Sequence, residues 1–409
     1  MKILIIDEWI PLPLDSGKKI RTYNLLSPLA KKHQISYLCY ADQRKEKLKI
    51  DEMEKIGFKV YSVPPSHKFD SFTKLAAGIF TGFFTKQPLV VRKHYSSRFQ
   101  KKLIQLIAEN NFDLIHCEWT HYGQFINKSI RLPKFLSSHN VEYIPWLRFF
   151  QYEKNIIKKC GLYIEWKKMK FFEKKTLSKF DHISVVSDND LRLIKNWFGN
   201  KSIQVIPNGI NCFYYSKIDP APTEKTILFS ASMDAFVNQD AARYFSGKIL
   251  PKVKQKIPNI RFIILGRHPP ENIKKLSSEN IVVTGTVDDV RPFLKDSLVS
   301  VVPLRIAGGS RLKILEAFAA GIPVVSTTIG AEGLDVKNNI HLLVADNADN
   351  FAEAVIELIC NYETRSKLIK NARQLVEEKY DWGKIYPAIE KAWETTISKF
   401  NRRKVCNSH

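Results

Sequence analysis

The chain of 409 residues, 44% hydrophobic and 26% charged, is too long for one hydrophobic core and fits two or three domains. Its apolar content excludes a disordered chain, and 17 glycines and 19 prolines exclude collagen-like and low-complexity classes. The six cysteines lie far apart and include no C-x-x-C pair, which argues against a disulfide scaffold and a zinc cluster. Scattered cysteines with mostly apolar neighbours are typical of reduced core residues in a cytoplasmic protein.

The N-terminal segment MKILIIDEW predicts a buried first strand rather than a signal peptide, because Asp7 and Glu8 interrupt its apolar run. No apolar run in the sequence approaches the ~20 residues of a membrane-spanning helix. The net charge of +23 is unevenly divided: residues 1–200 hold 35 Lys and Arg against 19 Asp and Glu, and the rest hold 29 against 22. This excess in the first half suits an anionic partner, which could be a nucleic acid, a membrane or a substrate.

Short β-branched runs alternate with longer amphipathic stretches along the whole chain. The predicted strands are Ile3–Ile6, Ile35–Tyr40, Leu114–His116, Ile183–Val186, Ile203–Ile206, Thr226–Ser230, Arg261–Leu265, Ile281–Val283, Ser300–Val302 and Pro323–Ser326. The predicted helices are Ile20–Lys32, Ser97–Asn110, Asp240–Lys256, Ser310–Ala320 and Asn350–Tyr362. This alternation predicts parallel sheets covered by helices on both faces.

A turn-and-linker composition, PNG followed by DPAP, lies within residues 207–222 and separates two sets of elements. We therefore expect two doubly wound α/β domains in tandem, at residues 1–205 and 206–385. Open sheets of this kind bind ligands beyond the carboxyl ends of their strands. The loops that follow strands are consequently the candidate functional segments.

The most informative of these loops lies in VVPLRIAGGSRLKILEAFAAGIPVVSTTIGAEGL, residues 301–334. After a predicted strand come two glycines, a serine and a helix with two cations and a carboxylate: Gly308, Gly309, Ser310, Arg311, Lys313 and Glu316. Glycines let backbone N–H groups approach a ligand, and the helix N-terminus favours an anion, so this loop suits a phosphate. Cations in a first helical turn oppose the dipole preference and also indicate an anionic ligand. The alternative is a plain loop with a surface ion pair between Glu316 and Lys313.

Eight other segments of the chain, four in each half, contain sequence motifs of interest. The first half holds DSGKKIRTYNLL (15–26), FDLIHCEW (112–119), SSHNVE (137–142) and FDHISVVSDND (180–190). The second half holds PNGIN (207–211), FSASMDAFVNQDAARYF (229–245), FIILGRHP (262–269) and VTGTVDDVRPFL (283–294). Over nearly the whole chain these motifs resemble the family 4 (group 1) glycosyltransferases. The resemblance implies the GT-B fold, with two Rossmann-like domains facing a cleft and a last helix, residues 386–409, packed back on the first domain.

The chain departs from the family pattern in its donor domain. Many members carry E-x7-E, whose second Glu corresponds to Glu316, but the first falls on Gly308. The GSRLKILEA sequence instead resembles a subgroup that lacks the first Glu. An Arg and a Lys that grip the diphosphate in many relatives are also absent after the first donor-domain strand. Arg311, Lys313 and Arg267 are candidate replacements, or the loop amides alone suffice.

The resemblance implies a role for each donor-side residue. Glu316 would accept hydrogen bonds from the ribose hydroxyls, the base would lie against Thr286 and Val287, and Gly17 would pass under the donor phosphate unless it is a plain turn glycine. Amides, a helix dipole and cations can stabilise a diphosphate leaving group without a metal. The Asp188–Asp190 segment has D-x-D spacing but opens a predicted helix, which favours helix capping. We expect no metal and no cofactor, with a nucleoside-diphosphate sugar as substrate.

The acceptor should bind to the first domain. His116 and Glu118 end one predicted strand and His139 follows another, which is where acid–base groups of an α/β sheet belong. We expect Glu118 or His139 to orient or deprotonate the acceptor hydroxyl, with His116 as the next candidate. The alternative for His139 is a core histidine bonded to backbone.

The expected function is retaining transfer of a hexosyl unit to a hydroxyl of a glycan or glycolipid in bacterial polysaccharide synthesis. Two Lys-rich aromatic segments, residues 68–102 and 149–179, predict a cytoplasmic protein held at the anionic inner face of the membrane, unless their aromatic side chains turn inward. The alternatives are a same-fold nucleotide-sugar epimerase and a non-catalytic protein, on a degenerate scaffold, that binds anionic membranes or nucleic acid. No RNA-binding aromatic motif or recognition helix is evident, so we expect no nucleic-acid partner.

Overall fold

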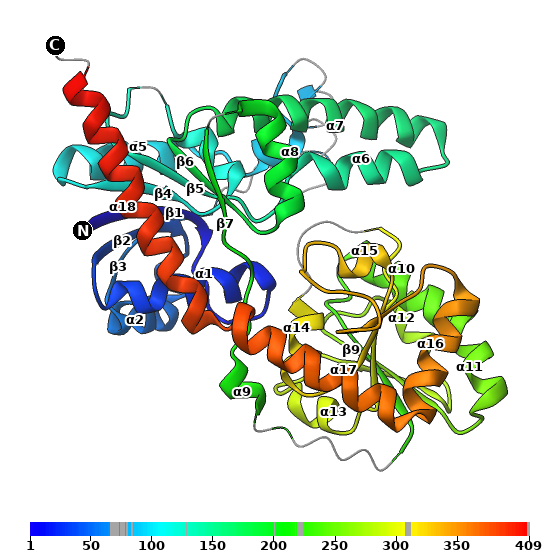
Figure 1. Ribbon diagram of the computed structural model, residues 1–409. Coiled ribbons are helices and arrows are strands. Elements are labelled where there is room, and N and C mark those ends of the chain that lie inside the picture. The colour runs from blue at the N-terminus through cyan, green and yellow to red at the C-terminus, as the bar shows by residue number, and fades with distance from the viewer. Residues whose placement is uncertain are drawn as a thin grey trace. The chain divides into compact units, whose positions relative to one another are not determined.

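The computed structural model describes residues 1–65, 73, 78, 81–82, 85–127, 129–199, 201–216, 218, 224–306 and 312–406. The chain forms two compact units, residues 1–207 with 385–409 and residues 208–384. These limits lie within two residues of the boundaries that the sequence indicates. Each unit is built on one parallel sheet with helices packed against it (Figure 1).

The first unit contains a seven-stranded parallel sheet with the order β3-β2-β1-β4-β5-β6-β7. Its strands are β1 (Lys2–Trp9), β2 (Gln34–Tyr40), β3 (Phe58–Val63), β4 (Leu114–Cys117), β5 (Lys134–Ser137), β6 (His182–Val185) and β7 (Ser202–Val205). Its helices are α1 (Gly17–Ala30), α2 (Lys47–Ile56), α4 (Leu89–Lys93), α5 (Ser97–Glu109), the 3-10 helix η1 (Thr120–Phe125), α6 (Tyr143–Tyr152), α7 (Ile156–Leu177) and α8 (Asp188–Phe198).

The last helix, α18 (Trp382–Cys406), belongs to the first unit from Ile385 onward. Trp393 on this helix is fully buried, and its ring lies 6.1 Å from that of His33 and 5.6 Å from that of His116. Glu390 on the same helix accepts from His33 Nε2 at 2.9 Å. Residues more than 270 positions apart in the sequence therefore share one core.

The second unit contains a six-stranded parallel sheet with the order β10-β9-β8-β11-β12-β13. Its strands are β8 (Thr226–Ser230), β9 (Arg261–Leu265), β10 (Ile281–Gly285), β11 (Val299–Val302), β12 (Val324–Ser326) and β13 (Leu343–Val344). Its helical elements are α9 (Cys212–Ser216), α10 (Phe236–Tyr244), the π-helical turn η2 (Phe245–Ile249), α11 (Leu250–Lys256), α12 (Glu271–Lys274), α13 (Arg291–Lys295), α14 (Leu312–Ala319), α15 (Thr328–Ala331), α16 (Ala348–Cys360), α17 (Tyr362–Leu375) and the π-helical turn η3 (Val376–Tyr380).

Each predicted strand overlaps an observed strand, and three observed strands, β3, β5 and β13, were not among the predicted runs. The strand β3 lies at an edge and is mostly half-buried, the buried strand β5 has the sequence KFLS, and β13 has two residues. None of the three is a continuous buried run of β-branched residues, which is the pattern that predicted the other strands. The predicted helix Asp240–Lys256 is interrupted by η2, directly ahead of Pro251 in α11. Because proline lacks a backbone N–H, the chain cannot continue a regular α-helical ladder there.

Across the described residues, no helix combines the length and the apolar composition needed to cross a membrane.

Candidate active site

The strand order of the first sheet reverses between β1 and β4, which are parallel neighbours with Ile6 opposite Cys117. Ligands of open α/β sheets bind beyond the carboxyl ends of the strands at this reversal point. Glu118 directly follows β4, and its N–H donates to Ile6 O at 3.0 Å. The predicted residue Glu118 therefore lies at the most favourable position of the first sheet.

The structure brings the three predicted catalytic residues together. His116 Nε2 lies 2.8 Å from Glu118 Oε2, and His139 Nε2 lies 3.2 Å from Glu118 Oε1. Thr22 on α1 donates its hydroxyl to Glu118 Oε1 at 3.0 Å. Both histidine nitrogens lie within ion-pair distance of the carboxylate, but their N–H directions are not aligned well enough for regular hydrogen bonds. The carboxylate thus links α1, β4 and the loop after β5.

Burial and charge give these groups different chemical roles. Burial alone would raise the pKa of Glu118, but the adjacent His116 and His139 reverse the shift and hold that pKa below its usual range. Such a carboxylate is a weak base at neutral pH. The exposed fraction is 1% for Glu118, 0% for His116 and 9% for His139. His139 is therefore the best placed of the three to meet another molecule, and Glu118 is suited to orient it.

Arg21 is a buried cation whose charge interacts with that of Glu118. It is fully buried and donates to the carbonyl oxygens of Ile206 at 2.8 Å and Pro207 at 2.6 Å. Burial lowers the pKa of Arg21 to about 10, although the negative charge of Glu118 opposes the shift. This buried guanidinium joins α1 to the segment after β7 and helps to balance the carboxylate.

A second polar group, at the carboxyl end of β1, was not predicted. Lys18 Nζ lies 2.7 Å from Asp7 Oδ1 and 3.2 Å from Glu8 Oε2, and it lies over the Trp119 ring at 4.6 Å. Tyr37 donates its hydroxyl to Asp7 at 2.6 Å. The sequence holds a signal for this group, because Asp7 and Glu8 interrupt the first apolar run at the carboxyl end of its strand.

Glu142, the last residue of the SSHNVE motif, was not predicted as a site residue, yet it has a distinctive environment. Trp119 Nε1 donates to Glu142 Oε1 at 2.7 Å, and the side chain is 8% exposed. Burial raises the pKa of Glu142 to about 7; the Trp119 N–H and Lys18 oppose this shift, while Asp190 and Glu8 add to it. Buried Glu173 accepts from the backbone N–H of Glu142 at 2.8 Å. The Glu142 carboxyl group can therefore gain or lose a proton near neutral pH.

Gly17 is exposed and is the first residue of α1, which leaves its backbone accessible to a ligand. Ser16 caps this helix by accepting from Lys19 N at 3.5 Å. The Asp188–Asp190 segment opens α8, with Ser187 as its N-cap residue, so helix capping explains the D-x-D spacing. In the part of the chain that the structure describes, no three His, Cys, Asp or Glu side chains cluster in a way that suits a metal ion. The absence of a cofactor remains a prediction.

In the second sheet the strand order reverses between β8 and β11. Lys313 Nζ donates to Asn238 Oδ1 at 3.1 Å and lies 4.9 Å from the centre of the Phe229 ring. Arg267 Nε donates to Ser232 Oγ at 2.9 Å, in the loop after β8. Lys313 and Arg267 are two of the three cations expected to replace the absent Arg and Lys that hold the diphosphate in many relatives. Both contact residues in or next to the loop after β8.

Arg305, which follows β11, was not predicted as part of this site. Its guanidinium donates to both carboxylate oxygens of Asp240, at 3.0 and 2.6 Å, and lies 4.5 Å from the Tyr244 ring centre. The bidentate ion pair fixes the end of β11 against α10, just ahead of the predicted phosphate loop. Gly308, Gly309, Ser310 and Arg311 of that loop lie outside the described residues.

Glu316 on α14 is half-buried and shares a hydrogen bond with the hydroxyl of buried Tyr215. Burial raises the pKa of Glu316, while Lys313 and the Tyr215 hydroxyl oppose the shift. The neighbouring Tyr214 donates to Asp289 Oδ1 at 3.3 Å, in the loop after β10 that also contains exposed Thr286 and half-buried Val287. The short helix α9 therefore ties the predicted ribose-binding carboxylate to the predicted base-binding loop.

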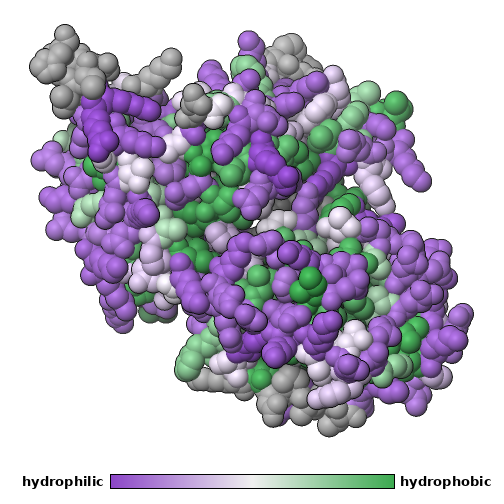
Figure 2. Space-filling view, viewed as in Figure 1, coloured by the Kyte–Doolittle hydropathy of each residue, from purple (hydrophilic) through white to green (hydrophobic). Residues whose placement is uncertain are grey.

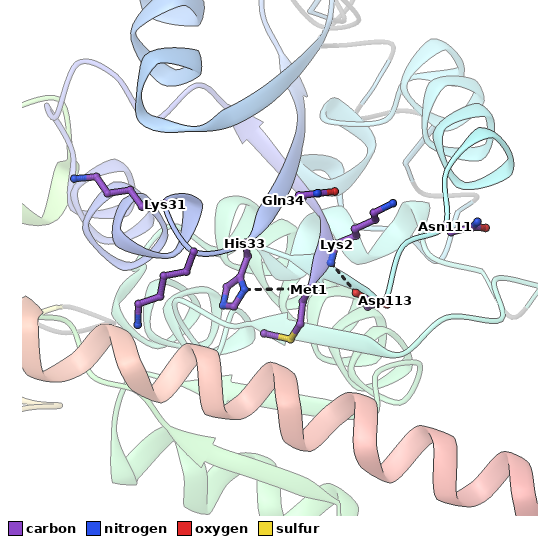
Figure 3. A pocket seen from close by; sticks show the side chains of 8 residues that line it. Met1, Lys2, Lys31, His33, Gln34, Asn111 and Asp113 are labelled. Atoms are coloured by element: carbon purple, nitrogen blue, oxygen red, sulfur yellow. Dashed lines mark hydrogen bonds between the residues drawn. The ribbon is translucent and has the colours of Figure 1, made fainter.

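A hollow of about 670 Å³ lies at the opposite, amino edge of the first sheet (Figure 3). Lys2 and Gln34 begin β1 and β2 there, and Asp113 accepts from Lys2 N at 2.7 Å. The Met1 amino group lies 3.5 Å from His33 Nδ1. Because ligands of such sheets bind at the carboxyl edge, this hollow is not the site predicted from the sequence.

Two family models match the chain. The model described as Glycosyltransferase Family 4 matches residues 17–212, and the model described as Glycosyl transferases group 1 matches residues 224–361. The chain is a family 4 (group 1) glycosyltransferase. The first match covers the Glu118 group and the second covers Lys313 and Glu316. The subgroup defined by the missing first Glu remains a prediction.

Sequence relatives of this glycosyltransferase are distant. An uncharacterized 44.6 kDa protein in the cps region of Klebsiella pneumoniae is 22% identical over 95% of this chain and 99% of its own length. A phosphatidyl-myo-inositol mannosyltransferase of Mycolicibacterium smegmatis is 26% identical over 51% of this chain and 56% of its own length.

Solved structures share the fold. Sucrose-phosphate synthase from Thermosynechococcus elongatus has a TM-score of 0.70 at 15% identity and covers 98% of this chain, with all of that chain matched. Anabaena HepE in complex with UDP-glucose has a TM-score of 0.66 at 14% identity and covers 97% of this chain and 100% of its own. The predicted fold class, two Rossmann-like domains of the GT-B type, is confirmed.

Proposed function

We propose that this glycosyltransferase moves a hexosyl unit from a nucleoside-diphosphate sugar to a hydroxyl of a glycan or glycolipid, with retention of configuration, in the synthesis of a bacterial surface polysaccharide. The observation that carries the proposal is the gathering of Lys313, Arg267 and Glu316 around the strand ends of the second sheet. The UDP-glucose bound to the structurally similar HepE and the cps-region origin of one relative support it.

On the donor side, Lys313 and Arg267 would face the diphosphate, whose negative charge grows as the bond between the sugar C1 and the phosphate oxygen breaks. Preorganised cations and amides stabilise such a charge with little reorganisation. The loop of residues 307–311 would supply the amides, and Glu316, held by Tyr215, would bind the ribose. No metal is needed in this scheme.

On the acceptor side, His139 is the group proposed to touch the acceptor hydroxyl, and Glu118 is a positioning residue. The ionised Glu118 carboxylate favours the His139 tautomer with the proton on Nε2, which leaves Nδ1 free of a proton and able to accept one. As the acceptor oxygen bonds to the sugar C1, its proton would pass to the departing phosphate oxygen or to His139.

The first experiment is a thermal-shift panel of UDP-, GDP- and ADP-sugars, followed by product analysis with the stabilising donor. The proposal expects one donor class to raise the melting temperature and a product with the donor's anomeric configuration. An epimerised donor without transfer would favour the epimerase alternative. Affinity for RNA equal to that for the nucleoside diphosphate, without turnover, would favour the non-catalytic alternative.

The location proposed for the enzyme is the cytoplasmic side of the membrane, where a lipid-linked acceptor would be reached. The positive charge of the first half of the chain supports this location.

Chelation by EDTA tests whether the transfer needs a metal. It should leave turnover unchanged if the diphosphate is held by cationic side chains and amides alone.

A further inference from the structure

Helices α6 and α7 form a two-helix hairpin in the first unit, joined by residues 153–155, and its free end projects beyond the sheet (Figure 1). The two helices pack together along the hairpin: Phe150 stacks on Trp166 with ring centres 5.9 Å apart and an interplanar angle of 6°. Met169 and Phe172 are buried. Much of the aromatic cluster that suggested membrane contact therefore packs within the protein.

The free end of the hairpin is different. Ile156 and Ile157 are adjacent residues in the first turn of α7, and their exposed fractions are 72% and 80%. Tyr152, at the end of α6, is 46% exposed. Figure 2 shows a hydrophobic patch at this end of the hairpin, bordered by hydrophilic surface. We name this surface, residues 152–159, the hairpin tip.

The local fold does not require these isoleucines. Asn155 begins α7 by accepting from Lys158 N at 3.1 Å, and Glu153 accepts from the backbone N–H of Asn155 at 2.8 Å. The tip is thus built by polar capping contacts, while two large apolar side chains face water. Single exposed apolar residues are ordinary, but an adjacent pair at the end of a projecting element is a feature of interaction sites.

Charge indicates what covers the tip. Lys154 and Lys158 are exposed beside the isoleucines, and Lys159 lies over the Phe150 ring at 5.5 Å. Glu153 is the one acidic residue among residues 152–159. A two-fold contact with a second copy would set these lysines against lysines, which is unfavourable. Apolar side chains ringed by lysines instead match the boundary between anionic headgroups and acyl chains.

We infer that the hairpin tip inserts Ile156 and Ile157 into an anionic lipid bilayer while Lys154 and Lys158 bind lipid phosphates. This inference deepens the proposed membrane location by assigning it to one element. It is independent of the chemistry of sugar transfer, because the tip contains none of the residues of the Glu118 group.

The test is co-sedimentation of the full chain with vesicles of phosphatidylcholine alone and of phosphatidylcholine mixed with phosphatidylglycerol. Ile156→Ser together with Ile157→Ser should weaken binding to the mixed vesicles by roughly 10-fold or more. Leu48→Ser is the matched control, since Leu48 is 85% exposed on α2 of the same unit. It should bind as the parent chain does. Lys154→Gln and Lys158→Gln should each weaken binding about 5-fold, and added salt should remove their effect.

Three outcomes would overturn the inference. One is unchanged vesicle binding by the double isoleucine variant. Another is equal binding to both vesicle types that added salt does not weaken. The third is a concentration-dependent dimer that the double variant abolishes in the absence of lipid, which would make a second copy the occupant. Turnover with a soluble acceptor tests the transfer reaction separately, and the tip variants should leave it unchanged.

Discussion

Nε2 of His116 lies 2.8 Å from Oε2 of Glu118, and both side chains are almost completely removed from solvent. A buried carboxylate in such a contact is held ionised by its neighbours rather than poised to take up a proton. Glu118 and His139 were both candidates for direct contact with the acceptor hydroxyl. The contact favours His139, the more exposed of the two, for this role, and Glu118 would act by positioning the histidines.

The substitution His139→Ala should lower turnover by roughly 10²–10⁴-fold, because it removes the group that positions or deprotonates the acceptor hydroxyl. The affinity for the nucleoside diphosphate should survive, since Lys313, Arg267 and Glu316 belong to the second unit. Steady-state turnover and calorimetric nucleotide affinity are the measurements. Nearly normal turnover would return His139 to the role of a core histidine and make His116 the next candidate.

The substitution Glu118→Gln should affect both stability and turnover. It removes the charge shared by His116, His139 and Arg21, and breaking a buried charge pair costs on the order of 3 kcal/mol. Turnover should fall less than for His139→Ala, because the glutamine keeps the shape of the side chain. Chemical denaturation and turnover would be measured together. A variant as stable as the parent would contradict the assigned network.

The pKa of Glu142 predicts a pH dependence of stability. Its pKa in the folded state, about 7, exceeds the ordinary value of 4.5, so the folded state binds the proton more tightly than the unfolded state does. The contribution to stability is complete below about pH 4.5 and is lost as the pH rises through 7. The parent chain should therefore lose on the order of 3 kcal/mol across this window relative to Glu142→Gln.

The check is urea denaturation of both proteins across that pH range, with the difference between them as the readout. Taking the difference cancels titrating groups that do not interact with Glu142. Lys18, Glu8, Asp190 and Glu173 face Glu142, so the difference reports the titration of Glu142 together with its coupling to these four groups. Parallel stability curves for the two proteins would show that Glu142 keeps an ordinary pKa.

Much of this fold is readable from the sequence because buried parallel strands are continuous apolar runs, as in Ile35–Tyr40, now seen as part of β2. The rule that strand ends carry function also selected Glu118 and His139, which the structure brings within 3.2 Å of each other. It did not locate Glu142, whose pKa is raised by burial and by Asp190 from another element, against the opposing effect of the Trp119 N–H. The hairpin tip lies within the segment 149–179 that was predicted to contact the membrane, but composition does not tell which aromatic side chains pack inward, so the tip could not be singled out.

The donor side offers the sharpest test of function. Glu316→Ala should weaken donor binding by roughly 10- to 150-fold, because it removes a charge-assisted hydrogen bond. Tyr215→Phe should weaken it about 10-fold through the loss of the hydroxyl that holds Glu316. Lys313→Ala should resemble Glu316→Ala, since its ammonium would face the diphosphate.

Nucleoside and nucleoside-diphosphate affinities separate these roles. Loss of the ribose contact in Glu316→Ala should weaken both ligands equally, whereas Lys313→Ala should weaken only the diphosphate. Asp349→Asn is a suitable control, because Asp349 forms an exposed ion pair with Lys252 on the same unit. Donor affinity that survives in both Glu316→Ala and Lys313→Ala would place the nucleotide elsewhere on the second sheet.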